Sequence, residues 1–285
     1  MRTTRSLAAA AAAAAMIAVS APATAAGHDD DHRDDHRDPL GLNATAQAAG
    51  LTPADGGQMG WRSSSSANPQ AAAADPTLSA TVAGIDVSNY QGSVDWASSY
   101  SQGKRFAYVK ASEGTYYTSP SFSSQYTGSY DAGFIRGSYH FANPSDSSGA
   151  AQATYFVEHG GGWSQDGKTL PGALDIEYNP YDGGTCYGLS QAAMVSWISD
   201  FVSTYKSLTG RDAVIYSTTD WWTTCTGNSS AFAASNPLWI ARYASSAGTL
   251  PAGWGYYTIW QNSSSPIDQD VFNGDESRLE ALANG

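Results

Sequence analysis

Hydrophobic and polar residues follow two distinct patterns from residue 81 onward. Short apolar runs of strand length alternate with polar stretches in which apolar or aromatic residues recur every three or four positions, the spacing of an amphipathic helix. The runs predict strands at residues 82–87, 105–111, 134–141, 170–177 and 213–217. The stretches between them predict helices at residues 94–102, 121–132, 148–159 and 189–208. The last helix is the clearest, because its large apolar side chains fall on one side: Met194, Trp197, Ile198, Phe201 and Tyr205.

The pattern changes after residue 217. Strands are predicted at residues 238–243, 256–261 and 267–272, with little room for full helices between them. Repeated βα units imply a parallel sheet, and eight strands favour closure into a barrel. A regular eight-fold barrel needs about 250 residues, more than residues 81–285 provide. We therefore predict an α/β fold, an irregular TIM-like barrel with five βα units followed by three strands.

The first 80 residues have a different character, since Trp61 is their only aromatic residue. Residues 1–26 resemble a secretory signal: Arg2 and Arg5 precede an apolar run at 7–19, and Ala23-Thr24-Ala25 is a small-residue cleavage pattern. The apolar run is too short to span a membrane comfortably, and no second run follows. We expect a secreted, extracellular protein with no membrane attachment after signal cleavage.

Residues 27–80 form a low-complexity extension. His28, His32 and His36 recur among aspartates, which is compatible with a metal-binding tract but on composition favours a solvated acidic segment. Residues 39–80 are rich in Ala, Ser, Gly, Pro and Asn, with almost nothing to bury. We interpret the extension as a disordered linker or a pro-segment, and residues 81–285 as the catalytic domain.

Cys186 and Cys225 are the only cysteines. In a secreted chain an even pair is most simply one disulfide, and a free catalytic thiol is disfavoured because no histidine lies in a suggestive position near either. The bond would close a loop of roughly 40 residues and stabilise the fold by about 3–4 kcal/mol.

Charge narrows the range of partners. The chain has 26 acidic and 14 basic residues, and residues 81–285 carry 18 of the acidic and 9 of the basic ones. This balance excludes the basic face that nucleic-acid phosphates require. The sequence has no phosphate-binding glycine loop and no zinc-type spacing after residue 80, where His140 alone lies near a strand end. We therefore predict no cofactor and no metal centre.

Carboxylates fall where a barrel places its chemistry, at the carboxyl ends of strands. Asp86 lies near the end of the first predicted strand. Asp175 and Glu177 are two residues apart on the fourth, so both point into the barrel mouth while Ile176 faces the helices. On the last strand Asp268 and Asp270 likewise share one side.

Because the first and last strands of a closed barrel are neighbours, we expect Asp86 and Asp268 side by side, with Asp175 and Glu177 across the mouth. Four carboxylates around one cavity raise the pKa of at least one of them, as a general acid near neutral pH requires. A single aspartate at a strand end is more often a turn residue. The Asp175–Glu177 pair is harder to explain structurally, since two carboxylates on an apolar strand are costly.

Aromatic side chains near the same strand ends are candidates for stacking on sugar rings, although each could equally fill the core. With the amide at the end of the seventh strand, the predicted substrate-binding residues are Tyr90, Tyr139, Phe141, Tyr178, Trp260 and Gln261.

Five segments of the chain resemble glycoside hydrolase family 25, the Chalaropsis-type lysozymes, and its Streptomyces members in particular. They are residues 84–92, 108–114, 136–141, 174–177 and 267–274, in the family's order along essentially all of 81–285. The resemblance implies cleavage of the β-1,4 bond between N-acetylmuramic acid and N-acetylglucosamine in peptidoglycan, including 6-O-acetylated material. It also implies the irregular barrel and a Cys186–Cys225 disulfide. We expect a monomer acting on glycan strands.

The same resemblance assigns catalytic roles. Glu177 would be the general acid, Asp175 would orient the substrate's acetamido group, and Asp86 and Asp268 would complete the ring of carboxylates. Retaining, inverting and substrate-assisted displacement all remain open, and the Asp-x-Glu arrangement favours the last. Two other functions are considered: a non-catalytic carbohydrate-binding barrel, and a chitin-active barrel, whose longer acidic strand motif is incomplete at residues 171–177.

Overall fold

The computed structural model describes residues 41–54, 56–62 and 80–285. The chain divides into two compact units, residues 1–35 and 36–285, and every described residue belongs to the second. The predicted signal sequence and the His/Asp tract lie outside the described residues. Among the described residues, no helix has the length and apolar character needed to cross a bilayer.

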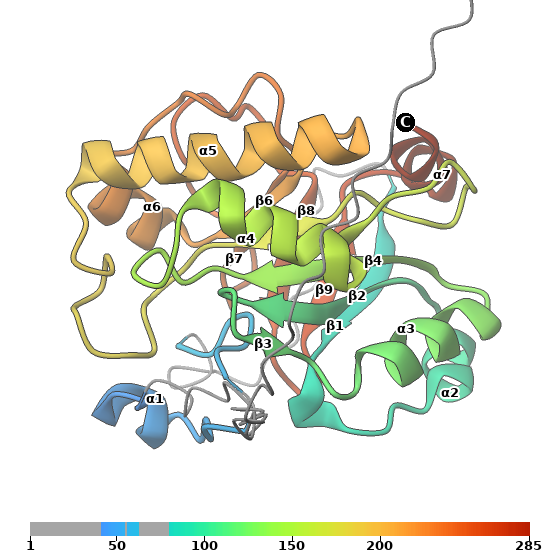
Figure 1. Cartoon of the computed structure of the whole chain (residues 1–285). Helices are drawn as coiled ribbons and strands as arrows, with labels where there is room; N and C mark the ends of the chain where they lie inside the picture. The colour runs from blue at the N-terminus through green and yellow to red at the C-terminus, as the bar shows by residue number, and fades with distance from the viewer. Residues whose placement is uncertain (1–40, 55, 63–79) are drawn as a thin grey trace, which may run out of the picture. The chain divides into compact units, whose positions relative to one another are not determined.

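One closed sheet forms the centre of the molecule (Figure 1). Its strands are β1 Val82–Val87, β2 Lys104–Glu113, β3 Tyr117–Thr118, β4 Ile135–Phe141, β5 Ala173–Asp175, β6 Val214–Ser217, β7 Leu238–Ala241, β8 Ile259–Ser263 and β9 Gln269–Phe272. The order is β1-β9-β8-β7-β6-β5-β4-β2-β3, and pairing of β1 with β2 closes eight strands into a barrel. The two-residue β3 only forms a hairpin with β2. The predicted irregular barrel is confirmed.

Helices surround the barrel, as Figure 1 shows for α3, α4 and α5. Their bounds are α1 Ala44–Ala48, α2 Trp96–Ser101, α3 Phe122–Asp131, α4 Gly149–Phe156, α5 Gln191–Thr209, α6 Thr219–Thr226 and α7 Glu276–Asn284. A π-helical turn at Val157–Gly161 follows α4. Helix α6 completes the fifth βα unit, whereas α1 and α7 have no counterpart in the sequence prediction.

Local sequence explains where the main helices begin and end. The side chains of Ser148, Ser190 and Thr218 accept hydrogen bonds from backbone N–H groups in the first turns of α4, α5 and α6. Gly210 ends α5 in the left-handed conformation, which a glycine adopts without a Cβ penalty. The five apolar residues predicted to share one face of α5 are all buried.

The last strand runs in the direction opposite to its neighbours, which the sequence pattern did not specify. β9 runs antiparallel to both neighbours, with Gly84 opposite Asp270 on one side and Gln261 opposite Asp270 on the other. A parallel arrangement needs a crossover of a dozen or more residues, and only residues 264–268 separate β8 from β9. The parallel pairing expected from the repeated βα units therefore does not extend to β9. The fourth predicted strand is also shorter, because β5 ends at Asp175.

The core has two layers. Inside the barrel, inward side chains such as Tyr108, Tyr139 and Trp239 form one cluster, which Leu279 and Ala283 of α7 close at one end. Outside, a second cluster lies between the strands and the helices and includes Phe201 of α5. Helix α7 therefore covers the bottom of the barrel, the end opposite the carboxyl ends of its parallel strands.

Residues 41–62, blue in Figure 1, pack on the barrel, and this corrects the expectation that residues 39–80 have almost nothing to bury. Their buried hydrophobic residues are Leu42, Ala46, Leu51, Met59 and Trp61. Four of them cluster with Phe141 and Tyr181, and Met59 instead joins the cluster inside the barrel. Whether the extension is a pro-segment stays a prediction.

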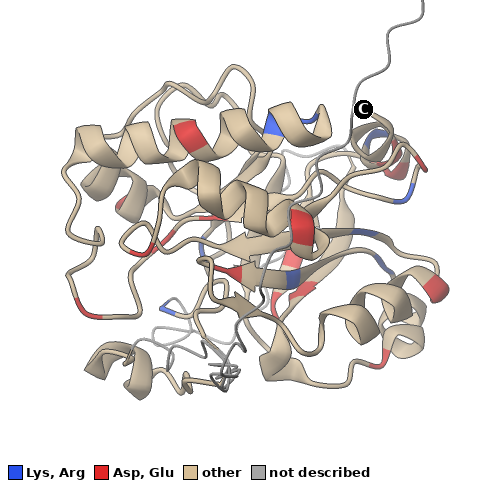
Figure 2. Ribbon diagram, in the orientation of Figure 1, with Lys and Arg blue, Asp and Glu red and all other residues tan. Residues whose placement is uncertain are grey.

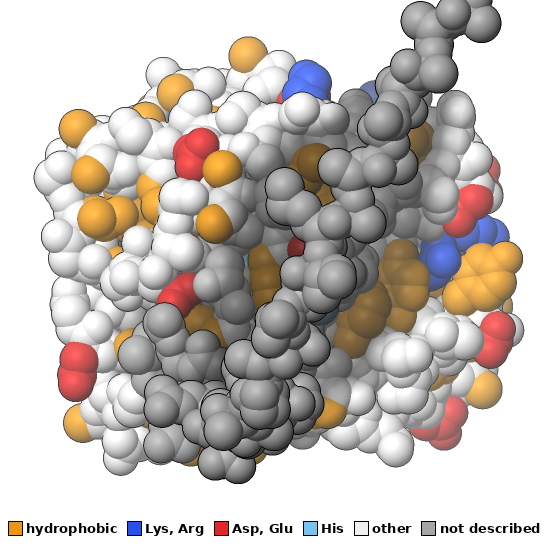
Figure 3. Space-filling view, in the orientation of Figure 1, with side chains coloured by type: hydrophobic (Ala, Val, Ile, Leu, Met, Phe, Trp, Pro, Cys, Tyr) orange, Lys and Arg blue, Asp and Glu red, His pale blue; other side chains and the backbone are white. Residues whose placement is uncertain are grey.

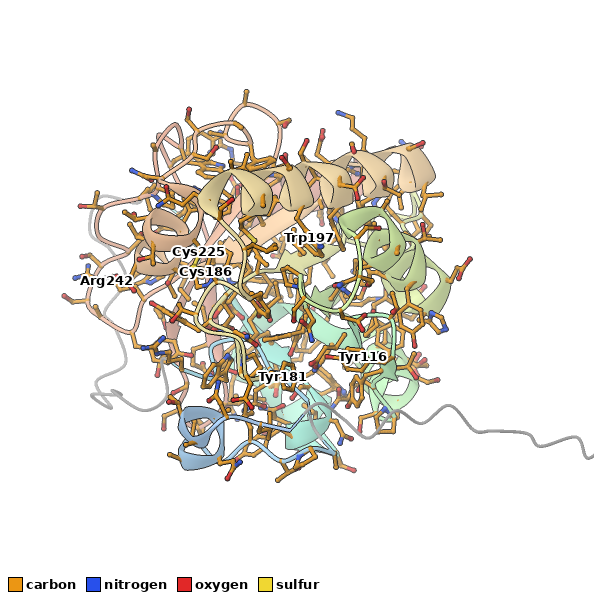
Figure 4. The ribbon with its side chains drawn as sticks, turned by 60° about the vertical axis from the view of Figure 1, so that its left-hand side comes forward. Tyr116, Tyr181, Cys186, Trp197, Cys225 and Arg242 are labelled. Atoms are coloured by element: carbon orange, nitrogen blue, oxygen red, sulfur yellow. A yellow bond between two sulfur atoms is a disulfide. The ribbon has the colours of Figure 1, made fainter. Side chains whose placement is uncertain are left out.

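Cys186 and Cys225 form a disulfide that joins the loop after β5 to α6 (Figure 4). The two residues are 39 positions apart, and the Cys225 side chain is buried in the outer core. The predicted pairing is confirmed.

We expect the double variant Cys186→Ser/Cys225→Ser to lose about 3–4 kcal/mol in free energy of unfolding, because the unfolded chain regains the entropy of a loop of that length. Urea unfolding followed by tryptophan fluorescence measures the loss. The parent protein under reducing conditions is the control and should match the variant. A loss below about 1 kcal/mol would show that the loop is already restricted in the unfolded chain.

Candidate active site

The predicted carboxylates gather at the end of the barrel opposite α7, which we call the mouth. Asp86 lies on β1, Asp175 ends β5, Glu177 follows two residues later, and Asp268 precedes the first residue of β9. In the antiparallel pairing of β1 with β9, Ile85 lies opposite Gln269. Continuing this register by one residue brings Asp86 opposite Asp268. Asp268 reaches the mouth because β9 runs antiparallel; in a parallel β9 its position would fall at the opposite end.

Several oxygens of the mouth carboxylates have no hydrogen-bond partner among the described residues. Asp86, Asp175 and Glu177 are buried, whereas Asp268 is partly exposed. Neither carboxyl oxygen of Asp175 has a hydrogen-bond partner among the described residues, and neither does Oε2 of Glu177. Buried polar atoms are nearly always paired in folded proteins, so these unpaired oxygens call for a partner that the described residues do not provide. These oxygens can accept hydrogen bonds that the described residues do not supply.

Gln261 holds Asp86 in place. Its Nε2 donates to Oδ2 of Asp86 over 2.7 Å. The hydroxyls of Tyr216 and Tyr243 donate to its Oε1 over 2.7 and 3.1 Å. Because the two phenols occupy the carbonyl oxygen of the amide, the NH₂ group must face the carboxylate. Gln261, predicted as a substrate-binding residue, is therefore part of the network that fixes a mouth carboxylate.

A fifth carboxylate lies deeper in the barrel. Asp270 is buried on β9 and accepts a hydrogen bond from Nε1 of Trp239 over 3.0 Å. The sequence placed it on the same side as Asp268 but did not include it in the site. The period-two pattern of the strand was the signal that could have done so.

Burial raises the pKa of these groups. The pKa of Glu177 rises to about 8, chiefly through burial, against the lowering effect of a hydrogen bond from Gly60. The pKa of Asp86 rises to about 7, again through burial. For Asp175, burial and then the charge of Glu177 raise the pKa well above its ordinary value. Desolvation and the charge of Asp86 also raise the pKa of Asp268. Protonated carboxyls at neutral pH are what a general acid requires.

An ion pair that the sequence analysis did not identify lies beside the mouth. Lys110 and Glu113 at the end of β2 are both buried, with Nζ and Oε2 separated by 2.6 Å. Tyr116 donates to the other oxygen of Glu113 over 2.9 Å, and the hydroxyl of Tyr181 contacts the same oxygen. Both charged residues lie within segment 108–114, so their position was visible in the sequence although their pairing was not.

The predicted aromatic residues fall into different environments. Tyr139 is buried inside the barrel, with its hydroxyl close enough to Asp86 and Asp175 for their charges to raise its pKa. Phe141 is buried against residues 41–62. Tyr178 is partly buried and its hydroxyl donates to Asp220 over 2.7 Å. Tyr90 is 58% exposed on the turn Asn89–Gln91 after β1. All four lie on elements that reach the mouth.

The position of Trp260 corrects the prediction that this residue binds substrate. Its neighbours Ile259 and Gln261 point into the barrel, so Trp260 points outward and packs in the outer core with residues such as Tyr257. Its Nε1 donates to the backbone oxygen of Arg242 over 2.9 Å. The ring therefore supports the wall of the barrel and does not face the mouth.

His140 belongs to the outer core as well. Its Nδ1 lies 2.9 Å from Oγ of Ser112 and its Nε2 lies 3.0 Å from Oε1 of Gln152. Burial lowers its pKa to about 3, so the ring is neutral. Within the part of the chain that the structure describes, no group of three or more His, Cys, Asp or Glu side chains could hold a metal ion.

Basic side chains do not gather into a surface patch on the visible face. Figure 2 shows blue segments dispersed among red ones, and red segments at the ends of the barrel strands. In the part of the face that Figure 3 does not draw in grey, charged side chains are scattered among polar ones.

The family model of glycosyl hydrolases family 25 matches residues 85–271, which include the mouth carboxylates. The chain belongs to this family. The predicted relationship is confirmed, and so is the prediction that the protein is a glycoside hydrolase of the lysozyme type. The non-catalytic carbohydrate-binding alternative loses its support.

The individual proteins that this chain resembles support the same family assignment. Lysozyme M1 of Streptomyces globisporus is 47% identical over 264 residues, covering 86% of this chain and 90% of the relative. The N,O-diacetylmuramidase of a Chalaropsis species is 53% identical over 212 residues, covering 72% and 100%. The solved muramidase from Acremonium alcalophilum is 64% identical, with a TM-score of 0.70, covering 72% and 99%. The match to lysozyme M1 exceeds what residues 81–285 alone provide, so it extends into the preceding segment.

Raised carboxyl pKa values predict a pH-dependent stability. A carboxyl group with a raised pKa in the folded state favours folding while it is protonated, and this contribution is lost as the pH rises through the folded value. With folded pKa values of about 7 for Asp86 and about 8 for Glu177, the free energy of unfolding should fall between pH 5 and pH 9. We expect a decrease of at least about 1 kcal/mol, measured by denaturant unfolding at each pH.

The variant Asp86→Asn provides the comparison, because it removes one of these titrations and should flatten the decrease. Stability that is constant or rises across the interval in the parent protein would mean that the mouth carboxyls are ionised in the folded state.

Proposed function

We propose that this protein is a secreted lysozyme that hydrolyses the β-1,4 bond between N-acetylmuramic acid and N-acetylglucosamine in peptidoglycan, with Glu177 as general acid. Family membership supports the reaction class. The observation that carries the residue assignment is the position of Glu177 at the mouth, buried, with Oε2 unpaired and a pKa raised to about 8. Such a group holds its proton at neutral pH and can transfer it to the leaving glycosidic oxygen.

Asp175 is the second catalytic residue of this proposal. It lies two residues before Glu177, and both of its oxygens are buried and unpaired. A hydrogen bond from the substrate's acetamido N–H would favour the ionised form of this carboxyl, which burial and the charge of Glu177 otherwise disfavour. The carboxylate would then orient the acetamido oxygen towards the anomeric carbon and stabilise the positive charge that develops there. This supports a substrate-assisted displacement with retention of the β configuration.

Asp86 and Asp268 complete the mouth in this mechanism. Asp86 is held by Gln261, so its carboxyl has a fixed orientation towards the site. The hydroxyl of Tyr243 lies within hydrogen-bonding reach of both Asp268 and Gln261, and its single proton can serve one of them at a time. We propose that Asp86 and Asp268 position the sugar, with Gln261 and Tyr243 as positioning residues, while the attacking water enters from the side of Glu177, which takes its proton after the leaving group departs.

The glycan would extend over the aromatic residues around the mouth. Tyr90 and Tyr178 present rings at the ends of β1 and β5, and a hollow of about 490 Å³ lies at the ends of β6 and β7, lined by Thr218, Asp220 and Tyr243. Relatives named N,O-diacetylmuramidase support action on muramic acid that carries an O-acetyl group. The proposal requires no cofactor and no second subunit.

Glu177→Gln should abolish clearing of a peptidoglycan suspension, at least about 100-fold in rate, because the amide cannot donate a proton to the leaving oxygen. The matched control is Glu158→Gln, an exposed glutamate on the π-helical turn after α4, which should clear at the parental rate. Far-UV circular dichroism verifies that both variants fold. Parental clearing by Glu177→Gln would refute the assignment of the acid.

Proton NMR of the freshly formed reducing end tests the displacement. Substrate assistance predicts a β anomer at first, and it also predicts poor hydrolysis of glycans whose acetamido groups have been removed. Asp175→Asn should lower kcat by about 10²–10⁴-fold, the range of a positioned polar group in catalysis. An initial α anomer would contradict this mechanism while leaving the assignment of Glu177 intact.

Chitin is the remaining alternative substrate, since it has the same β-1,4 linkage and acetamido groups. Parallel digests of chitin, peptidoglycan and O-acetylated peptidoglycan, with the reducing ends identified by mass spectrometry, distinguish the substrates. We expect muramic acid reducing ends from both peptidoglycans. Soluble sugars from chitin alone would replace the proposed function.

A further inference from the structure

We infer that residues 56–62 occupy the glycan-binding mouth of the barrel and block it, so that the intact chain is an autoinhibited form of the enzyme. The inference rests on the proposed function, because it assigns a regulatory segment to the same site. It follows from the contacts of this short stretch with the mouth residues, taken in turn.

The first contact is with the proposed acid. The backbone N–H of Gly60 donates to Oε1 of Glu177 over 2.6 Å. In the reaction a protonated Glu177 must donate in the direction of a glycosidic oxygen. Here the carboxyl instead accepts a hydrogen bond from the polypeptide, so the backbone of Gly60 lies against the proposed acid, in space that a bound glycan would need.

Gly60 also fits the centre of the mouth closely. A Cβ at this position would lie 2.7 Å from Oε1 of Gln261 and closer still to the hydroxyl of Tyr243, and φ is +72°. Any other residue would both overlap the network that holds Asp86 and adopt an unfavourable backbone conformation. The backbone at residue 60 therefore fills the space between Glu177 and Gln261.

A second anchor lies at the buried ion pair. The N–H of Gly57 donates to Oε2 of Glu113 over 2.8 Å, and Nζ of Lys110 donates to the carbonyl oxygen of Gly57. A Cβ at Gly57 would overlap the ring of Phe141. The Lys110–Glu113 pair thus presents one acceptor and one donor that match the N–H and the C=O of a single residue, which explains a pair that the proposed reaction does not use.

Tyrosines on the barrel support this anchor. Tyr116 and Tyr181 both donate to Glu113, and Figure 4 shows these two residues on the side of the barrel that carries the blue segment. They hold the carboxylate in position for the amide of Gly57. Charge-assisted bonds of this kind are stronger than those between neutral groups.

Side chains of residues 56–62 cover parts of the mouth that the backbone of the segment does not fill. Met59 is buried in the cluster inside the barrel and its backbone forms a hydrogen bond with Tyr139. Nε1 of Trp61 donates to the backbone oxygen of Tyr178 over 2.9 Å, and the guanidinium of Arg62 lies 4.2 Å from the centre of the Tyr178 ring. The predicted sugar-stacking surface of Tyr139 and Tyr178 is therefore already in contact with protein.

The preceding residues fasten the segment to the rim. Leu42 forms a bridge with Tyr181, and Asn43 donates from its backbone N–H to Pro180 over 2.8 Å and from its side chain to Asn179 over 3.0 Å. Covalent attachment makes the block intramolecular, so the segment competes with a glycan at a high effective concentration.

The first test compares intact and cut protein. A recognition sequence for a site-specific protease is placed between residues 62 and 81, and the released segment is removed. The barrel should fold without it, since solved relatives that are 64% and 52% identical match 72% of this chain and nearly all of their own. We expect the cut enzyme to clear peptidoglycan at least about 10-fold faster than the intact chain. Equal rates would overturn the inference.

A second test leaves the chain intact. Gly57→Val/Gly60→Val should expel the segment from the mouth and raise the clearing rate towards that of the cut enzyme. Gly41→Val is the matched control, because a Cβ at Gly41 has no atom within 4 Å, and it should retain the parental rate. A double variant with the low parental rate would contradict the block.

Added peptide distinguishes occupation of the mouth from a general effect on the fold. A synthetic peptide of residues 41–62 should inhibit the cut enzyme by raising KM while kcat stays unchanged. The same peptide with valine at positions 57 and 60 should not inhibit. A decrease in kcat without a change in KM would mean that the segment acts elsewhere.

Hydrogen exchange tests whether the segment occupies the mouth and requires no activity measurement. In the full chain the amides of Gly57 and Gly60 should exchange at least about 100-fold more slowly than in the free peptide, because both donate to buried carboxylates. Unprotected amides would refute the block even if the enzyme is active. Protected amides in a protein that clears no peptidoglycan after cutting would refute the proposed function and leave the occupation of the mouth intact.

Discussion

Burial of acidic groups at one end of the barrel is the constraint on which the structure depends. Asp86, Asp175 and Glu177 lie out of contact with water at the mouth, and the buried cation nearby, Lys110, pairs with Glu113. Such an arrangement is costly unless the groups are protonated, hydrogen-bonded or waiting for a ligand. The dense aromatic interior of the barrel and the hydrogen bond from the amide of Gln261 offset the free-energy cost of this burial. As a result the mouth contains carboxyl groups that stay protonated at neutral pH.

The segment that precedes the barrel is part of the same arrangement. Residues 56–62 supply backbone donors to Glu113 and Glu177, and they increase the burial that raises the pKa of the mouth carboxyls. When the segment leaves, water enters and the desolvation that dominates the shift of Glu177 decreases. The hydrogen bond from Gly60 and the charge of Arg62, which lower the pKa of Glu177, are lost at the same time, so the two effects on this pKa oppose each other.

Much of the fold could be predicted from the sequence because the periodicities were strong. The alternation around Asp175, Ile176 and Glu177 correctly separated inward from outward residues, and the apolar face of α5 was complete. The prediction was incomplete where the local sequence pattern does not specify the direction of a side chain or of a strand. Trp260 was assigned to the mouth because it is aromatic and near a strand end, although the alternation with Gln261 places it outside. The antiparallel course of β9 followed from the shortness of its connection, which the composition of the strand does not express.

The sequence by itself determined the family, the number and order of the barrel units, the disulfide and the carboxylates that lie at strand ends. These properties are encoded locally, in spacing and in motif. Only the tertiary structure decided that Lys110 pairs with Glu113, that Gln261 orients Asp86, and that a glycine-rich stretch of unremarkable composition fits the mouth. Glycines at positions 57 and 60 carry no side chain to signal a role. Their function arises from what a Cβ would strike, and those atoms lie on strands distant in the sequence.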